Sequence, residues 1–227
     1  EFDMTNDSKH FKPREWWEER GYRPDVFGRW LGPEGDVALP LYEGRMIGQF
    51  DFSEKGYVSG RGRSAVWREI PFEEKVIEPQ YLMGEGVMKG EIGERQSVKV
   101  GFMDITSATN ARSMIALVLV GVPCGNKVPT LRMKEKRYIE HILLSAFCNS
   151  ISFDFACRTR LAGITLNWFI MEECPIPRVG GWGEEGGEGG SGDDMPGDGM
   201  PGDGMPGDDM PGDGMPGDKS SGYYRTV

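Results

Sequence analysis

The chain has 227 residues, with 26 Lys and Arg against 36 Asp and Glu, a net charge of −10 at neutral pH. Residues 1–178 hold 24 basic and 25 acidic side chains, net −1, whereas residues 179–227 hold 2 and 11, net −9. The acidic balance therefore belongs to the C-terminal part and does not exclude an anionic partner for the rest. The longest apolar run, Met114 to Val122, is shorter than the ~20 residues of a membrane span, so no membrane partner is expected.

The composition predicts that the chain has a folded part and a disordered part, and that it belongs in a reducing compartment. Residues 1–178 read as one globular domain, and residues 179–227 as a disordered tail. There the unit M-P-G-D-G recurs with period five from Met195 and cannot bury enough apolar surface to fold. The four cysteines form no C-x-x-C pair and follow no secretory leader, which favours a reduced, cytoplasmic setting. Because the first residue is Glu1, we expect the chain to be a piece of a longer protein.

The N-terminal third predicts one helix and two short strands. Proline near its start and glycine after its end favour a helix over Pro13–Arg20, whose tryptophans we expect to pack on the core or a neighbouring domain. Two strand-like runs follow in Val37–Phe52, around a polar corner at Glu43-Gly44. Arg45 in this corner is either a solvated turn residue, a DNA contact or part of a link to another domain.

A basic, glycine-rich stretch comes next. Ser53–Glu74 is predicted as a flexible loop in which Arg61 and Arg63 would reach phosphates, although an ordinary solvated loop fits the same residues. Val76–Leu82 is then predicted as an edge strand, because Pro79 cannot donate to a ladder.

Two apolar runs enclose the most informative turn. Val98–Ile105 alternates like a half-buried strand and Met114–Val120 is continuously apolar, with a polar turn between them. Hydroxyls, an amide and a guanidinium at the tip of such a hairpin indicate recognition. For Asn110 the alternative is that it caps its own turn.

Three further elements complete the folded part. Apolar residues at three- and four-residue spacing predict a helix over Lys134–Cys148, with His141 off the stripe and partly exposed. Ile151–Cys157 alternates like a strand, and Ile164–Ile170 is predicted as a last strand ended by Cys174-Pro175.

Three motifs in order carry a resemblance to a known family. They are LPLYEGRMIGQFD at Leu39–Asp51, DITSATNARSMIA at 104–116 and CNSISFDFACRTRLAGITLNWF at Cys148–Phe169. Together they resemble the target-recognition region of adenine-specific DNA methyltransferases, of the single-chain restriction-modification type and the phage-defence type known as BREX. The resemblance runs from Phe2 to near Pro177 and departs from the family pattern at Ser107, Ala111 and Ser113. It implies an α+β fold with a mixed sheet and a few helices, and a short helix in place of the strand at Ile151–Cys157.

The resemblance also implies a function. This chain would select the sequence of double-stranded DNA, while a methyltransferase domain in cis or in trans transfers methyl from S-adenosylmethionine to the N6 atom of adenine. No cofactor is expected in this chain itself. Polar and basic side chains would contact phosphates and base edges. The candidate DNA-binding residues are Arg45, Arg61, Arg63, Thr109, Asn110, Arg112 and Lys127.

The sequence carries no catalytic motif of an adenine methyltransferase. The chain has no Asn-Pro or Asp-Pro dipeptide of the kind that holds the target amine, and Gly84–Gly90 misses G-x-G-x-x-G by one position, so a glycine-rich turn is expected there. Asp25 with Glu73-Glu74-Lys75 is a weak match to a metal-dependent nuclease. Two alternatives remain: a complete enzyme with a cofactor pocket, or a non-catalytic docking module that binds a partner methyltransferase through its N-terminal tryptophans, Trp16, Trp17 and Trp30.

Overall fold

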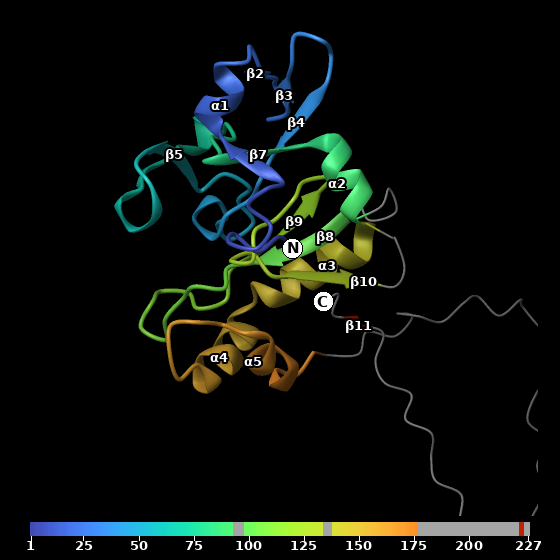
Figure 1. Cartoon of the computed structure of the whole chain (residues 1–227). Helices are drawn as coiled ribbons and strands as arrows, with labels where there is room; N and C mark the ends of the chain where they lie inside the picture. The colour runs from blue at the N-terminus through green and yellow to red at the C-terminus, as the bar shows by residue number, and fades with distance from the viewer. Residues whose placement is uncertain (93–97, 134–137, 177–222, 225–227) are drawn as a thin grey trace, which may run out of the picture.

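The computed structural model describes residues 1–92, 98–133, 138–176 and 223–224. These residues form three sheets and five α-helices, which confirms the α+β class (Figure 1). All strand pairs in the sheets are antiparallel, so the expected mixed sheet is wrong. The predicted disordered tail lies outside the described residues, apart from Tyr223–Tyr224. Within the described ranges, no helix is both long and apolar enough to cross a membrane.

The first sheet has five strands in the order β1-β7-β4-β3-β2. β7 begins after Pro79 and lies between β1 and β4, so the expected edge position is wrong, and the missing proline N–H costs the ladder nothing. β4 pairs with β3 and β7 rather than with a strand after Glu43, where the chain forms a short 3₁₀ helix, η1. The bounds are β1 (Phe11–Pro13), β2 (Arg23–Pro24), β3 (Trp30–Leu31), β4 (Val37–Pro40), η1 (Gly44–Met46) and β7 (Tyr81–Gly84).

An aromatic cluster holds α1 (Arg14–Glu18) against this sheet. The predicted helix is present, with its Arg14–Glu18 ion pair at 3.4 Å. Trp17 and Trp30 are buried, and the Trp17 ring meets the Tyr22 ring edge-on at 4.7 Å. Trp17 and Trp30 therefore belong to an internal cluster, as expected for packing on the core, and of the three tryptophans of the docking hypothesis only Trp16 stays partly exposed.

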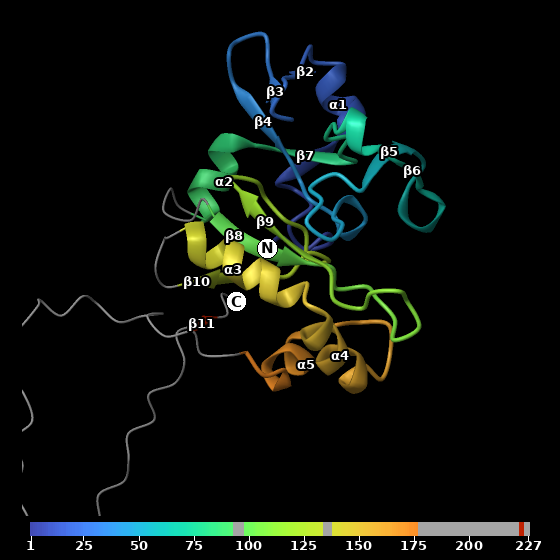
Figure 2. The ribbon, with the colours of Figure 1, turned by 180° about the vertical axis from the view of Figure 1, so that it is seen from behind.

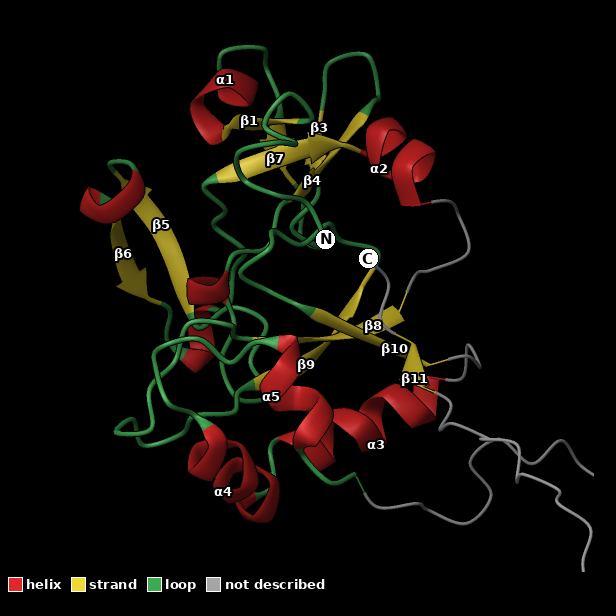
Figure 3. Ribbon diagram, turned by 60° about the horizontal axis from the view of Figure 1, so that its bottom comes forward, coloured by secondary structure: helices red, strands yellow, loops and turns green. Residues whose placement is uncertain are grey.

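The second sheet supplies the main core. Its order is β11-β10-β8-β9, and all five residues of β8 are buried. The register pairs Phe102 with Ala116 and Val98 with Val120, which confirms the predicted strands on either side of the polar turn. Helix α3 (Tyr138–Cys148) packs against β8, β9 and β10, and α4 and α5 follow it on the same side of the sheet (Figures 1 and 3). The bounds are β8 (Val98–Phe102), β9 (Ala116–Val120), β10 (Thr130–Met133) and β11 (Tyr223–Tyr224).

The expected basic loop is instead a two-stranded hairpin, β5 (Lys55–Ser59) and β6 (Val66–Glu69). Tyr57 pairs with Trp67 across it, with ring centroids 5.7 Å apart, and this aromatic pair stabilises the ribbon. Gly60 and Gly62 have φ of 85° and 55° in the connection, a conformation that other residues adopt only with strain. Sequence reasoning took these glycines as loop mobility, whereas they serve a defined turn.

The predicted helix α3 is present, but it buries a different face from the one expected. α3 (Tyr138–Cys148) confirms the described part of the predicted helix, whose first four residues, 134–137, lie outside the described residues. In it His141 is buried, while Ile139 and Ile142 are more than half exposed. The expected status of His141 was therefore wrong. Helices also replace the strand expected at Ile151–Cys157, as the resemblance implied, and the turn expected at Gly84–Gly90. The strand expected at Ile164–Ile170 is wrong as well, because Thr165 forms only an isolated bridge to Ile105 and a helix begins at Trp168. The bounds of these helices are α2 (Glu85–Ile92), α4 (Ile151–Arg160) and α5 (Trp168–Glu173).

Phe102 is the side chain on which the main core depends most directly. It is fully buried on β8, and its ring meets that of Trp168 on α5 edge-on at 5.5 Å. Phe102→Ala should therefore lower the free energy of unfolding by about 4 kcal/mol, measured by urea denaturation. Val120→Ala, at a half-exposed position of β9, should lower it by less than about 1 kcal/mol. Equal losses in the two variants would contradict this placement of the core.

Candidate nucleic-acid interface

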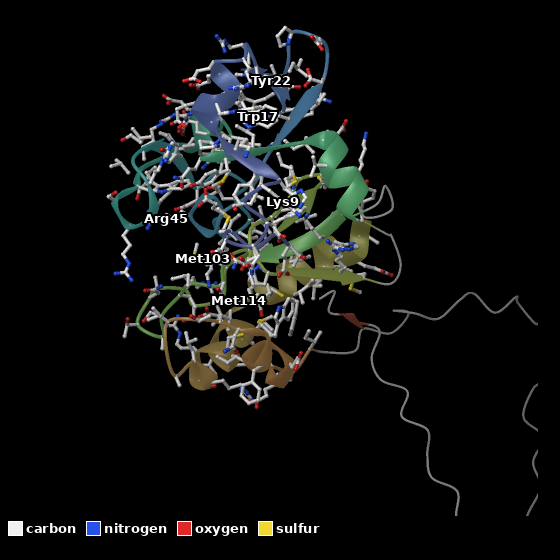
Figure 4. The ribbon with its side chains drawn as sticks, viewed as in Figure 1. Lys9, Trp17, Tyr22, Arg45, Met103 and Met114 are labelled. Atoms are coloured by element: carbon white, nitrogen blue, oxygen red, sulfur yellow. The ribbon has the colours of Figure 1, made fainter. Side chains whose placement is uncertain are left out.

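A groove of about 650 Å³ separates the β5–β6 hairpin from the start of the loop between β8 and β9. The hairpin and the loop project from the same side of the molecule in both views (Figures 1 and 2). Arg45 and Met103 lie on this side, between the two projections (Figure 4). The groove is lined from several distant segments, by Met4, Ser8, Phe11, Lys12, Pro13, Glu43, Gly44, Arg45, Gly62, Ala65, Trp67, Gln80, Tyr81, Met103, Ile105 and Lys127.

Several of the predicted DNA-binding cations meet at this groove. Arg45 donates to the carbonyl of Ala65 at 3.3 Å and lies 5.9 Å from the centroid of the Trp67 ring. Lys127 pairs with Asp104 at 2.8 Å but keeps half of its side chain exposed. These contacts hold the two cations in place and leave part of each accessible to an anion.

The hairpin tip adds two more cations. Arg61 and Arg63 flank Gly62, which lines the groove, and both are exposed. Neither forms an ion pair with another described residue. Long exposed guanidinium groups on a defined turn can reach phosphates without first breaking an internal pair.

Glu43 is the one carboxyl side chain among the groove-lining residues. Burial raises its pKa to about 7, and the nearby guanidinium of Arg45 offsets only part of that effect. One of its carboxyl oxygens, Oε1, is buried and accepts no hydrogen bond from a described residue. Near neutral pH this carboxyl is about half protonated, so it cancels only part of the positive charge of the groove.

Asp154 of α4 binds the backbone of the loop between β8 and β9. Its Oδ1 accepts from the backbone N–H groups of Ser113 at 2.7 Å and Met114 at 2.8 Å. Burial alone would raise the pKa of Asp154, but these two donors and the guanidinium of Arg158 together hold it below its ordinary value. The carboxylate therefore replaces the ladder partners that the chain lacks just before β9.

Arg158 and Asn149 complete this loop clamp, which we define as Asn149, Asp154 and Arg158. The Arg158 guanidinium donates to the carbonyls of Ala108, Asn110 and Ala111 at 2.7, 2.8 and 3.1 Å and to Asp154 at 2.9 Å. The Asn149 amide exchanges two hydrogen bonds with the backbone of Ala116. Sequence reasoning missed all three clamp residues. The available signal was that all three lie in the third motif of the resemblance.

The clamp leaves part of the predicted tip exposed. The side chains of Thr109 and Asn110 are exposed, and that of Asn110 makes no hydrogen bond to another described residue, so it does not cap its own turn. Arg112 is less available: it donates to the carbonyl of Asn149 at 3.3 Å and lies 4.0 Å from Asp154. Of the predicted tip residues, Asn110 is free for a ligand, Thr109 is exposed but shares a hydrogen bond with the Ser107 hydroxyl at 2.8 Å, and Arg112 is used internally.

A larger groove, of about 980 Å³, lies between the β2–β3 turn, residues 75–78 and β9. Two of its three cations are ion-paired, Lys75 with Asp51 at 2.6 Å and Arg14 with Glu18. Of the residues of the nuclease match, Asp25 and Lys75 both line this groove, but each is ion-paired, Asp25 with Arg29, and Glu73 and Glu74 do not line it, so the acidic residues of the match are not brought together. In the described part of the chain, no group of three or more His, Cys, Asp or Glu side chains could hold a metal ion.

The loop clamp predicts a specific loss of stability. Asp154→Ala leaves two buried N–H groups and Arg158 without their acceptor, so the free energy of unfolding should fall by about 3 kcal/mol at pH 7. Because the folded pKa is depressed, this contribution is present above the ordinary carboxyl value of 3.8 and is lost as the pH falls through the folded pKa. Urea denaturation at pH 7 and near pH 2 measures both. Glu173→Ala, a half-exposed carboxylate, should have little effect, and a difference that persists in acid would contradict the assignment.

Glu43 predicts the opposite pH dependence. Its folded pKa of about 7 lies above the ordinary value of 4.5, so the folded state binds the extra proton and loses stability as the pH rises between these two values. Relative to wild type, Glu43→Gln should gain about 3 kcal/mol between pH 4.5 and pH 8 in urea denaturation. Glu69→Gln, on an exposed position of β6, should follow wild type. Parallel pH profiles for wild type and Glu43→Gln would show that this carboxyl ionises freely.

No protein-family model, no curated protein and no solved structure matches this chain, so the site is assigned from its own residues.

Proposed function

We propose that this chain recognises double-stranded DNA on behalf of an adenine-specific DNA methyltransferase. In this proposal the duplex lies along the groove between the β5–β6 hairpin and the β8–β9 loop. The observation that carries it is that Arg45 and Lys127 line one groove, and that the exposed Arg61 and Arg63 flank Gly62, which lines the same groove. The family resemblance supplies the link to methylation.

The charges of the groove support a phosphate contact. Arg61 and Arg63 are exposed and form no ion pair with a described residue, so binding a phosphate would not cost them an existing pair. Arg45 and Lys127 are held by neighbours but remain partly exposed. Since residues 1–178 have a net charge of only −1, it is this local gathering of cations, and not net charge, that supports the proposal.

The loop supports a sequence-reading role. Its backbone is held by the loop clamp while Thr109 and Asn110 stay exposed at the tip. A rigid support with exposed amide and hydroxyl groups suits base-edge contact, because an asparagine amide can bind adenine through two hydrogen bonds. In this proposal the cations set the register on the backbone, and Thr109 and Asn110 read bases.

Catalysis is assigned to another domain. A methyltransferase domain, joined in cis or bound in trans, would hold S-adenosylmethionine, flip the adenine out of the duplex and transfer the methyl group. This chain would contribute the choice of site. The proposed setting is the cytoplasm, where such an enzyme would meet phage or cellular DNA.

Removal of the hairpin-tip cations tests the proposal. The double variant Arg61→Ala/Arg63→Ala should bind a mixed duplex at least tenfold more weakly at low salt. The slope of log affinity against log salt should also fall by about 2, one for each lost phosphate contact. Fluorescence anisotropy over a salt series measures both quantities. The control, Arg20→Ala/Lys89→Ala, removes two exposed cations, one just after α1 and one on α2, and should behave as wild type. Binding that is absent in the wild type, or unchanged in the hairpin variant, would contradict the proposed groove.

A second candidate function, a protein-docking module, is favoured by the outward face of α3. Ile139, Ile142 and Leu143 on this face are 56%, 53% and 42% exposed, an unusual number of large apolar side chains for one helix. If the wild-type chain binds no duplex at any salt concentration, this surface becomes the better starting point. A partner would then protect these residues from hydrogen exchange, whereas DNA would protect the hairpin tip.

A further inference from the structure

Two of the four cysteines lie side by side without being bonded. Cys157 Sγ on α4 is 3.4 Å from Cys174 Sγ, at the residue that ends α5. Both belong to the core cluster formed around β8 and the C-terminal helices. The two sulfurs come from separate elements and are free thiols, so their approach is a property of the tertiary fold.

We propose that Cys157 and Cys174 are a modification site, a dithiol that peroxides oxidise to a reversible disulfide joining α4 to α5. The sulfurs would have to approach by roughly 1.4 Å to reach a disulfide bond length. Cys174 lies at a helix end beside exposed Pro175, where a small backbone shift disturbs few hydrogen bonds. This inference does not depend on the proposed DNA-binding function.

The surroundings of the two sulfurs shift their pKa values in opposite directions. The two thiols share one hydrogen bond, in which either sulfur can donate, and Arg160 favours a negative charge on Cys174. Together these lower the pKa of Cys174 despite its burial. The pKa of Cys157 is raised, first by that same hydrogen bond and then by its burial. Cys174 is also the outer residue, 5% exposed against 0% for Cys157. Cys174 is therefore the attacking thiolate and Cys157 the resolving thiol.

The reaction balances with hydrogen peroxide as the oxidant. The Cys174 thiolate attacks one peroxide oxygen, the O–O bond breaks, and hydroxide leaves to give a sulfenic acid. Cys157 then attacks that sulfur, the S–O bond breaks, and a second hydroxide leaves. With the protons released by the two thiols, the sum is two thiols and one H₂O₂ converted into one disulfide and two waters.

The other two cysteines serve as internal references. Burial raises the pKa of Cys148 to about 12, which leaves almost no thiolate at neutral pH. Cys124 lies in a different core cluster, with Tyr42 and Leu117. Neither should react with peroxide under conditions that oxidise Cys174.

The test is a thiol count with mapping on the full-length chain. After mild peroxide treatment and denaturation, titration should find two free thiols in place of four, and the intact mass should fall by two hydrogen atoms. Digestion without reductant should yield one linked pair of peptides, those containing Cys157 and Cys174, and reductant should restore four thiols. Four surviving thiols, or a linked pair that includes Cys124 or Cys148, would overturn the proposal.

Single variants check the order of the two steps. In Cys157→Ala the resolving thiol is absent, so Cys174 should be trapped as a sulfenic acid by dimedone. In Cys174→Ala no dimedone adduct should form at Cys157, and Cys124→Ala should still form the disulfide. If these core variants do not fold, the peptide mapping of the wild-type chain decides the proposal alone. A dimedone adduct on Cys157 in Cys174→Ala would contradict the assignment of the attacking sulfur.

Discussion

The carboxylate of Asp154 is the interaction on which the proposed interface depends. A loop that connects two buried strands has backbone N–H and C=O groups without a partner in the sheet. Here the side chain of Asp154, on a helix about 40 residues later, accepts hydrogen bonds from two of these N–H groups. Arg158, one turn further along α4, binds three more backbone oxygens and the same carboxylate. The charged pair is therefore a template for the loop, and it fixes the position of Thr109 and Asn110 relative to the hairpin.

The predictable part of the fold was the part with local signals. The alternating run of β8 and the continuous apolar run of β9 are strand patterns that need no partner to be recognised, and both strands are present. The periodicity of α3 gave its place in the chain but not its orientation, because His141, Leu144 and Ser145 face the sheet instead of Ile139 and Ile142. Which face of a helix is buried is set by the partner surface, and one sequence does not contain that information.

The incorrect predictions also concern features that depend on contacts between residues distant in the sequence. The β5–β6 hairpin was taken for a loop because its glycines and charges outnumber its strand-forming residues, although the Tyr57–Trp67 pair across it supplies the packing. The clamp could not be foreseen from spacing, since Asp154 and its partner Ser113 lie far apart in the chain. The candidate cations were predicted from their local sequence and from the family resemblance, and the structure adds which of them are ion-paired and which are not.

The central claim is that the groove between hairpin and loop is the surface that meets DNA. Photo-crosslinking of the full-length chain to duplex DNA, followed by mass spectrometry of the attached peptides, tests it most directly. The account predicts adducts in the hairpin tip around Arg61 and Arg63 and in the loop around Thr109 and Asn110. Adducts confined to the outward face of α3, or to the larger groove beside β9, would contradict it.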